Sequence, residues 1–317
     1  MQSPIRRFIT ACFVLVVCFD AASAAKYANE AFVLGAHARA LAMGGSAASF
    51  TDDPTAVYYN PAGLALVERQ QVALLHSETF GSLVNHDFLA YARPLTLRDK
   101  SGAGAIGIYR VGGGGIILTE KDPNTGGPKI ISEEGHYDYL VLVGGGLRLS
   151  DRWRLGGAAK VVLRSLAGNS AWGLGLDAGL QYGRRDDLTF GATLTNATST
   201  FLSYDNGTTE SIVPALRLGA SYRLVVDDFS VRAAADGDIL FEGRDESAQL
   251  AIGGASLDTH LGGEIGYHEI VYFRGGADIG RLTLGIGLRY QRFRLDGAFM
   301  DHSDLDNSYR VSLNIEL

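Results

Sequence analysis

The sequence predicts an all-β protein: a transmembrane antiparallel β-barrel of about 14 strands that encloses an N-terminal plug, which we call the hatch. Three observations support this fold class. Apolar and polar residues alternate from about residue 68 to the C-terminus. A compact run of turn formers and small residues, 52–64, comes before this region, and a secretion signal begins the chain.

Residues 1–24 have the features of a signal peptide. Arg6 and Arg7 form its positive end, and the apolar run 8–19 follows. An A-x-A cleavage motif at 22–24 ends the segment. A membrane anchor is the alternative, but the apolar run is too short to span a bilayer. We therefore expect cleavage after residue 24.

The composition of the remaining chain excludes several classes of function. Both cysteines, Cys12 and Cys18, lie in the signal, so neither disulfides nor thiol chemistry are expected. Loss of the signal changes the formal net charge from −7 to about −8, whereas nucleic-acid binding requires a basic patch. No apolar run long enough for a transmembrane helix follows the signal. The abundance of glycine (41) over proline (7) suits strongly curved sheets.

Residues 25–66 form the predicted hatch, the one region without strand-like alternation. Helix formers fill 36–43 and a glycine pair ends them. Asp-Pro and Asn-Pro steps then mark turns. The segment has too little apolar surface to fold alone, so we expect it to pack inside the barrel. The hatch motif that we expect to matter comprises Asp52, Asp53, Pro54, Asn60, Pro61, Ala62 and Gly63.

Residues 67–317 form the predicted barrel, with about 14 strands and an allowed range of 12 to 16. Along residues 152–164, for example, Trp153 and Leu155 share one face while Arg154 and Lys160 share the other. The predicted strands lie near 68–79, 84–95, 102–112, 135–149, 152–166, 170–182, 187–197, 211–224, 228–240, 257–267, 269–279, 281–290, 292–300 and 308–317.

The lengths of the connections support a barrel in a membrane. The long connections 113–134, 198–210 and 241–256 are all odd-numbered, and the even-numbered ones are short. A barrel with both termini on one side of the membrane has this pattern. A soluble β-sandwich is the alternative, but aromatic residues near the strand ends and strands of about ten residues favour a membrane wall.

Three motifs occur in order in the hatch: GAHARALAMGG at 35–45, DDPTA at 52–56 and NPAGL at 60–64. They resemble the N-terminal signature of the PorV/PorQ family of outer-membrane proteins, which is related to FadL-type channels for hydrophobic compounds. The resemblance covers nearly all of the mature chain. It implies a fourteen-stranded barrel in the outer membrane of a Gram-negative-type bacterium, with the Asn-Pro-Ala turn in the hatch. The C-terminal Leu317 departs from the aromatic residue that ends many such barrels.

The resemblance leaves two functions open. FadL-type members bind hydrophobic substrates and pass them inward through hatch movement and a lateral opening. PorV-type members instead hold the C-terminal signals of secreted cargo in the type IX secretion system. The expected partners are therefore outer-membrane lipids and either a hydrophobic or amphipathic small molecule or a secreted protein, around a monomeric barrel. Apolar residues in 113–134 favour the first function.

Enzymatic and cofactor chemistry are not expected. The stretch 102–107 matches G-x-G-x-x-G, but it lies within a predicted strand and no helix follows, so a nucleotide site is disfavoured. The seven histidines show no metal-ligand spacing, and we predict no metal or other cofactor. A surface enzyme is a third alternative, but no Ser-His-Asp order stands out.

Charged residues on the predicted inner face are the remaining candidates for a site. They have two interpretations: paired charges that brace the wall and the hatch, or a cation that captures the carboxylate of a ligand. The two interpretations are compatible, because a bound carboxylate would replace one partner. The residues are Lys160, Arg164, Asp177, Arg217, Asp236, Glu264, Arg274, Arg289 and Asp296.

Overall fold

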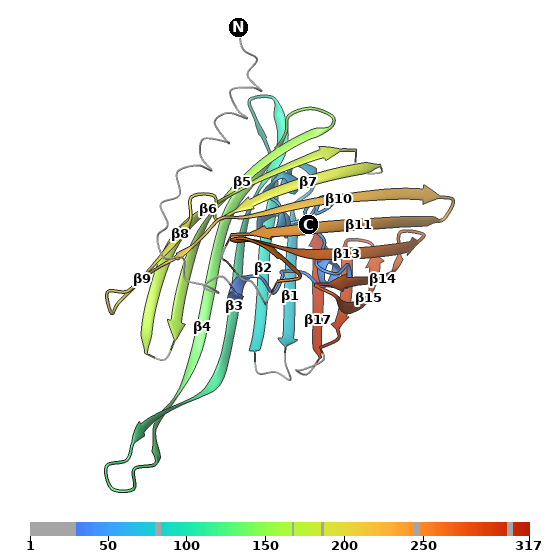
Figure 1. Ribbon diagram of the computed structural model, residues 1–317. Coiled ribbons are helices and arrows are strands. Elements are labelled where there is room, and N and C mark those ends of the chain that lie inside the picture. The colour runs from blue at the N-terminus through green and yellow to red at the C-terminus, as the bar shows by residue number, and fades with distance from the viewer. Residues whose placement is uncertain are drawn as a thin grey trace.

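The computed structural model describes residues 30–79, 84–166, 168–184, 187–241, 243, 248–302 and 307–317. Within these ranges, fourteen antiparallel strands close into one barrel (Figure 1). The predicted signal peptide, 1–24, lies outside the described residues. The predicted fold class and strand number are confirmed.

The barrel strands follow the order of the chain, each paired with the next. Closure comes from β1 and β17, which pair from Gln71 opposite Glu316 to Glu78 opposite Tyr309. Closure is required because an open edge in lipid would leave backbone groups unpaired. The strands are β1 (Gln71–Thr79), β2 (Val84–Leu97), β3 (Lys100–Lys121), β4 (Pro128–Arg148), β5 (Trp153–Leu166), β6 (Asn169–Gly183), β7 (Leu188–Thr195), β10 (Ala215–Val226), β11 (Phe229–Leu240), β13 (Ala255–Tyr267), β14 (Val271–Asp278), β15 (Arg281–Tyr290), β16 (Phe293–Met300) and β17 (Ser308–Glu316).

Three short strands lie within connections that the sequence predicts as loops. β8 (Thr200–Tyr204) and β9 (Thr209–Ile212) form a hairpin, and β8 also pairs with β6. β12 (Leu250–Ile252) pairs with β13. These strands are too short for an alternating pattern to reveal them.

The predicted loop 113–134 is largely strand. β3 and β4 continue to Lys121 and Pro128 and project well past the neighbouring strands as a two-stranded arm (Figure 1). A register shift between Gly113 and Ile116 marks an irregularity where the arm leaves the wall. The ladder continues because β-branched and leucine residues, which favour strands, flank the tip on both sides.

The long connections all lie at one end of the barrel, and the connections at the other end are short. The two-residue connections 98–99, 227–228 and 291–292 lie at one end, which we call the turn end. The arm and the β8–β9 hairpin lie at the other, the loop end. Both ends of the barrel chain meet at the turn end, where Leu317 N donates to Gln70 O at 2.8 Å. The predicted sorting of long and short connections is confirmed.

The two faces of the wall follow the alternation in the sequence. On β5, Trp153 and Leu155 point outward and are exposed, whereas Arg154 and Lys160 point inward and are buried. An outward apolar face suits contact with lipid chains, and polar inner positions suit a lumen.

The hatch crosses the lumen as a chain of short helices. They are η1 (Glu30–Phe32), α2 (Ala38–Ala42), α3 (Ala56–Tyr59) and η2 (Pro61–Leu66). α2 packs against β14 to β17, and η2 packs against β3 to β6 on the other side of the barrel. No helix in the described ranges is long and apolar enough to cross a membrane. Two separate parts of the wall therefore hold the hatch.

Candidate functional site

Asn60 fastens the hatch to the wall at β6 and β7. Its amide nitrogen donates to Ala48 O at 2.7 Å within the hatch, to Leu180 O at 3.2 Å and to Ala192 O at 3.4 Å. Its amide oxygen accepts from Ala62 N at 3.1 Å, which caps η2. The side chain is fully buried. Only an amide offers this donor and acceptor set in one compact group.

Four inward-facing glycines form a seat for the hatch, three of them under this turn and Gly191 under Ala48. A Cβ built on Gly156 would lie 2.2 Å from the carbonyl carbon of Pro61, and one on Gly179 would lie 2.1 Å from the amide oxygen of Asn60. Such distances are not tolerated, so these positions require glycine for the hatch to approach. The seat consists of Gly146, Gly156, Gly179 and Gly191, on β4, β5, β6 and β7.

We expect replacement of Asn60 by alanine to weaken the attachment of the hatch. The change removes the buried amide that donates to the carbonyls of Ala48 and Leu180, and only Ala48 O keeps a second side-chain donor, Gln181, so we expect a cost of about 1–3 kcal/mol in unfolding free energy. Urea unfolding of the purified barrel measures the cost. Asn124→Ala, at the exposed tip of the arm, is the matched control and is expected to have no measurable effect. Equal effects of the two changes would contradict the role given to Asn60.

The acidic part of the hatch motif stabilises the hatch itself. Asp53 accepts from the backbone N of Thr55 at 2.9 Å and from its hydroxyl at 2.5 Å, at the start of α3. The Pro54 carbonyl accepts from Val57 N at 3.3 Å. Asp52 lies 3.7 Å from a guanidinium nitrogen of Arg39. These contacts shape the turn between α2 and α3.

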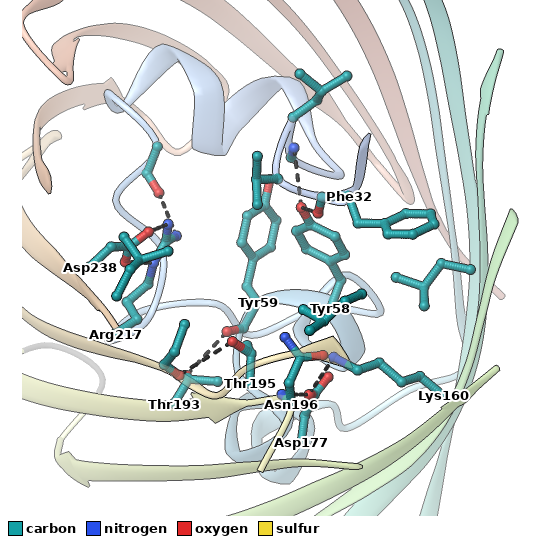
Figure 2. Close-up of a pocket in the computed structure, with 18 of the residues that line it drawn as sticks. Phe32, Tyr58, Tyr59, Lys160, Asp177, Thr193, Thr195, Asn196, Arg217 and Asp238 are labelled. Carbon is teal, nitrogen blue, oxygen red and sulfur yellow. Dashed lines mark hydrogen bonds and ion pairs between the residues drawn. The ribbon is translucent and has the colours of Figure 1, made fainter. Parts of the chain in front are cut away.

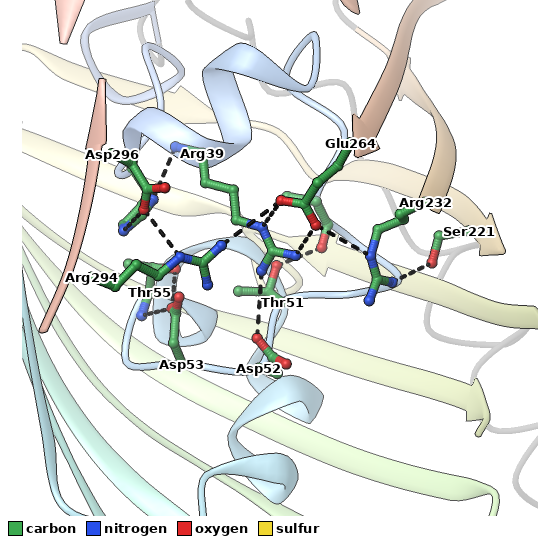
Figure 3. Close-up of polar contacts among 12 residues, drawn as sticks. Arg39, Thr51, Asp52, Asp53, Thr55, Ser221, Arg232, Glu264, Arg294 and Asp296 are labelled. Atoms are coloured by element: carbon green, nitrogen blue, oxygen red, sulfur yellow. Dashed lines mark hydrogen bonds and ion pairs between the residues drawn. The ribbon is translucent and has the colours of Figure 1, made fainter. Parts of the chain in front are cut away.

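A network of buried charges joins the hatch to the wall on its turn-end side (Figure 3). Arg39, from α2, donates to both carboxylate oxygens of Glu264, at 3.0 and 2.8 Å. Arg274 donates to Glu264 at 2.6 Å and to Asp296 at 2.8 Å. Glu264 also lies 3.8 Å from Arg294 and 3.9 Å from Arg232. Glu264 is therefore the centre of a cluster of four guanidinium groups.

His37 lies beside this network as the N-cap of α2. Burial lowers the pKa of His37, although Asp53 and Asp296 act in the opposite direction. The neutral ring accepts from Arg39 N at 3.0 Å through Nδ1. Its Nε2 lies 3.2 Å from Ser312 Oγ. The imidazole therefore links the first turn of α2 to β17 without adding charge.

Other predicted lumen charges also find partners. Lys160 donates to Asp177 at 2.6 Å. Arg217 pairs with Asp238, and Asp236 accepts from the hatch backbone at Ala47 N, 2.8 Å, and Ala48 N, 2.9 Å. These contacts fit the bracing interpretation.

Two of the predicted residues lie apart from those contacts. Arg164 pairs with Asp138 at 2.9 Å on the wall. Arg289 lies near the turn end, half-exposed, and pairs with Glu316 at 3.3 Å. Arg289 lies beyond Gly287, the last buried inward position of β15, and pairs with the wall rather than with the hatch.

A cavity of about 150 Å³ lies on the loop-end side of the hatch. Tyr58, Tyr59 and Phe32 of the hatch form one side (Figure 2). Leucine, valine and isoleucine side chains of β4, β5, β9 and β10 form much of the rest. Polar groups, including the Lys160–Asp177 and Arg217–Asp238 pairs, stand at its edge. The cavity thus has an apolar body with polar groups around it.

Sequence reasoning did not single out several residues of this cavity. Tyr58 and Tyr59 occur between the DDPTA and NPAGL motifs of the hatch and line the cavity. Arg310 lies on the polar face of the last strand, so alternation alone places it inward. No local signal distinguishes it from the charged residues that brace the wall.

No protein-family model and no curated protein matches the chain. Solved structures do match it along nearly its whole length. The toluene transporter TbuX of Ralstonia pickettii matches with a TM-score of 0.57 at 16% identity, over 90% of this chain and 99% of its own. A FadL homologue of Pseudomonas aeruginosa matches with a TM-score of 0.54 at 12% identity, over 89% and 98%. The toluene transporter TodX of Pseudomonas putida matches at 0.52 and 14%, over 90% and 97%.

These matches show the fold. The chain has the outer-membrane β-barrel fold of FadL-like channels, as the sequence predicts. These three structures are described as toluene transporters or as a FadL homologue, not as PorV or PorQ proteins. The likeness to the PorV/PorQ family therefore stays a prediction, and the secretion alternative has no support from them.

Proposed function

We propose that this protein is a channel of a Gram-negative outer membrane that takes up small hydrophobic or amphipathic molecules. Substrate enters from the loop end, binds in the cavity above the hatch and passes to the periplasm when the hatch moves. In this arrangement the turn end faces the periplasm, the signal peptide is removed, and the barrel acts as a monomer without enzymatic activity.

The observation that carries the proposal is the position of the cavity. It lies directly on the hatch, and side chains such as Phe32, Leu142 and Val162 give it an apolar interior. A small molecule bound there would contact both the wall and the movable segment, which links binding to passage. The fold shared with two toluene transporters agrees with this function.

The proposal can be tested with a substitution that fills the cavity with a larger side chain. Leu140 points inward from β4 and lines the cavity, whereas Val143 on the same strand points outward and is 56% exposed. We expect Leu140→Trp to fill the cavity and to reduce uptake of radiolabelled toluene to the level of cells without the protein. Val143→Trp places the same side chain in lipid and is expected to leave uptake unchanged. The assay uses an outer-membrane host that lacks other channels of this fold.

Two results would contradict the proposal. One is uptake by the wild-type protein no faster than in cells without it. The other is equal uptake by the Leu140→Trp and Val143→Trp variants at equal amounts in the membrane. The amount of folded barrel is checked by its heat-dependent shift in gel mobility.

A further inference from the structure

Arg310 is a buried cation for which the described residues supply no ion-pair partner. Its side chain comes from β17 and is 3% exposed. Within the part of the chain that the structure describes, its guanidinium makes neither an ion pair nor a hydrogen bond, and its Nε is buried without a partner. Lys160 and Arg217, which line the same cavity, both contact a carboxylate. Arg310 therefore does not share their bracing role.

The residues directly opposite Arg310 on the two neighbouring strands carry no carboxylate. Its register partners are Ser77 on β1 and Ala298 on β16. The next inward residues on its own strand are Ser308 and Ser312. A buried charge without a partner is costly, and natural proteins keep such groups where they serve a ligand or another function.

The hatch places a second donor at the same point. A Cβ built on Gly35 would lie 2.9 Å from Arg310 Nη1 and 3.0 Å from the hydroxyl of Tyr59. The two groups therefore both lie against Gly35, at a position where a side chain would collide with them. Gly35 has a φ of +90°, a conformation that a residue with a side chain rarely adopts.

The hydroxyl hydrogen of Tyr59 is available to donate a hydrogen bond to a ligand. Its oxygen accepts from Ala36 N at 2.8 Å, and no acceptor for its own hydrogen lies among the described residues. The neighbouring Tyr58 differs, because its hydroxyl donates to Phe32 O at 2.6 Å. A guanidinium and a free hydroxyl thus face one spot at the edge of the cavity. A group of donors without acceptors is suited to an oxyanion.

We propose that Arg310 and the Tyr59 hydroxyl form a subsite for the carboxylate of a small amphipathic ligand. The guanidinium donates two parallel N–H bonds to the carboxylate, and the hydroxyl of Tyr59 adds a third. The apolar body of the ligand lies in the cavity, against side chains such as Phe32 and Leu140. The inference deepens the proposed function and rests on it, because the ligand reaches the subsite through this cavity.

Benzoate and toluene provide the test, because the two probes share a ring and differ in the carboxylate. Binding to the purified full-length barrel is measured by equilibrium dialysis for the wild type, Arg310→Met and Arg289→Met. We expect Arg310→Met to weaken benzoate binding about 10- to 100-fold, as the loss of charge-assisted hydrogen bonds requires. Toluene binding stays within about twofold. Arg289→Met, near the turn end, leaves both ligands unchanged.

The outcomes separate this inference from the proposed function. A wild-type barrel that binds toluene but not benzoate overturns the subsite and keeps the proposed function. A barrel that binds neither overturns both. If phosphate displaces the bound benzoate and toluene does not, the site is one for inorganic ions. That result also overturns the inference.

Stability distinguishes a ligand subsite from a brace in the wall. We expect Arg310→Met to unfold at the same urea concentration as the wild type or a higher one, because methionine replaces an unpaired buried charge. A lower midpoint together with unchanged benzoate binding would show a structural role. Tyr59→Phe is the second variant. It removes one donor, and we expect it to weaken benzoate binding about 3- to 10-fold without affecting toluene.

Discussion

Replacement of Glu264 by glutamine is expected to release the hatch and to lower the unfolding free energy of the barrel by about 3–5 kcal/mol. The carboxylate contacts Arg39 of the hatch and Arg274 of the wall at 3.0 Å or less. Two further guanidiniums, of Arg232 and Arg294, lie within 4.0 Å of it. Loss of this one negative charge leaves four cations crowded together in a buried site.

The remaining acids of the network cannot replace Glu264. Asp296 pairs with Arg274 and Arg294, and Asp52 lies 3.7 Å from Arg39. Glutamine keeps the shape of the side chain but provides one acceptor and no charge. Repulsion between the cations then favours movement of α2 away from the wall.

Urea unfolding measures the stability of the Glu264→Gln variant, and hydrogen exchange over residues 30–66 reports the release of the hatch. Glu316→Gln is the matched control. Glu316 pairs with Arg289 and Arg69 near the turn end, where both arginines are well exposed. Such pairs contribute less than about 1 kcal/mol. If Glu264→Gln is no more destabilising than the control, the network does not hold the hatch.

A leucine at Gly156 is expected to displace the Asn-Pro-Ala turn from its seat. The nearest hatch atom would be 2.2 Å from the new Cβ, and it belongs to the backbone of Pro61. Backbone cannot rotate away as a side chain does, so η2 must move as a unit. Overpacking of this kind costs about 2–3 kcal/mol. A displaced hatch also widens the water path through the barrel.

Gly157 provides the control, because it is the next residue on the same strand and faces outward. A Cβ there would meet only Asp177 O, at an ordinary 3.5 Å. Single-channel conductance in planar bilayers compares Gly156→Leu with Gly157→Leu. We expect larger and more variable currents from the first and wild-type currents from the second. Equal conductance of the two variants, with both barrels folded, would show that η2 does not block the lumen.

The alternation of apolar and polar residues in the sequence was enough to predict most strands of the barrel wall. In β5 the two faces can be assigned from the sequence, since successive side chains of a strand must point in opposite directions. The same local pattern gave fourteen strands and the inward position of residues such as Lys160. The arm formed by β3 and β4 was missed, because the glycine run before it resembles the base of a loop.

The partners of the inward charges depended on tertiary structure. Arg39 and Glu264 are separated by 225 positions, and Asp236 meets Ala47 across 189. Which inward residues meet depends on the register of every strand around the closed barrel and on the position of the hatch, and neither is a local property of the chain. For this reason the sequence by itself determined that charged residues line the lumen. Only the fold decided that Glu264 is surrounded by four arginines while Arg310 forms no ion pair with any described residue.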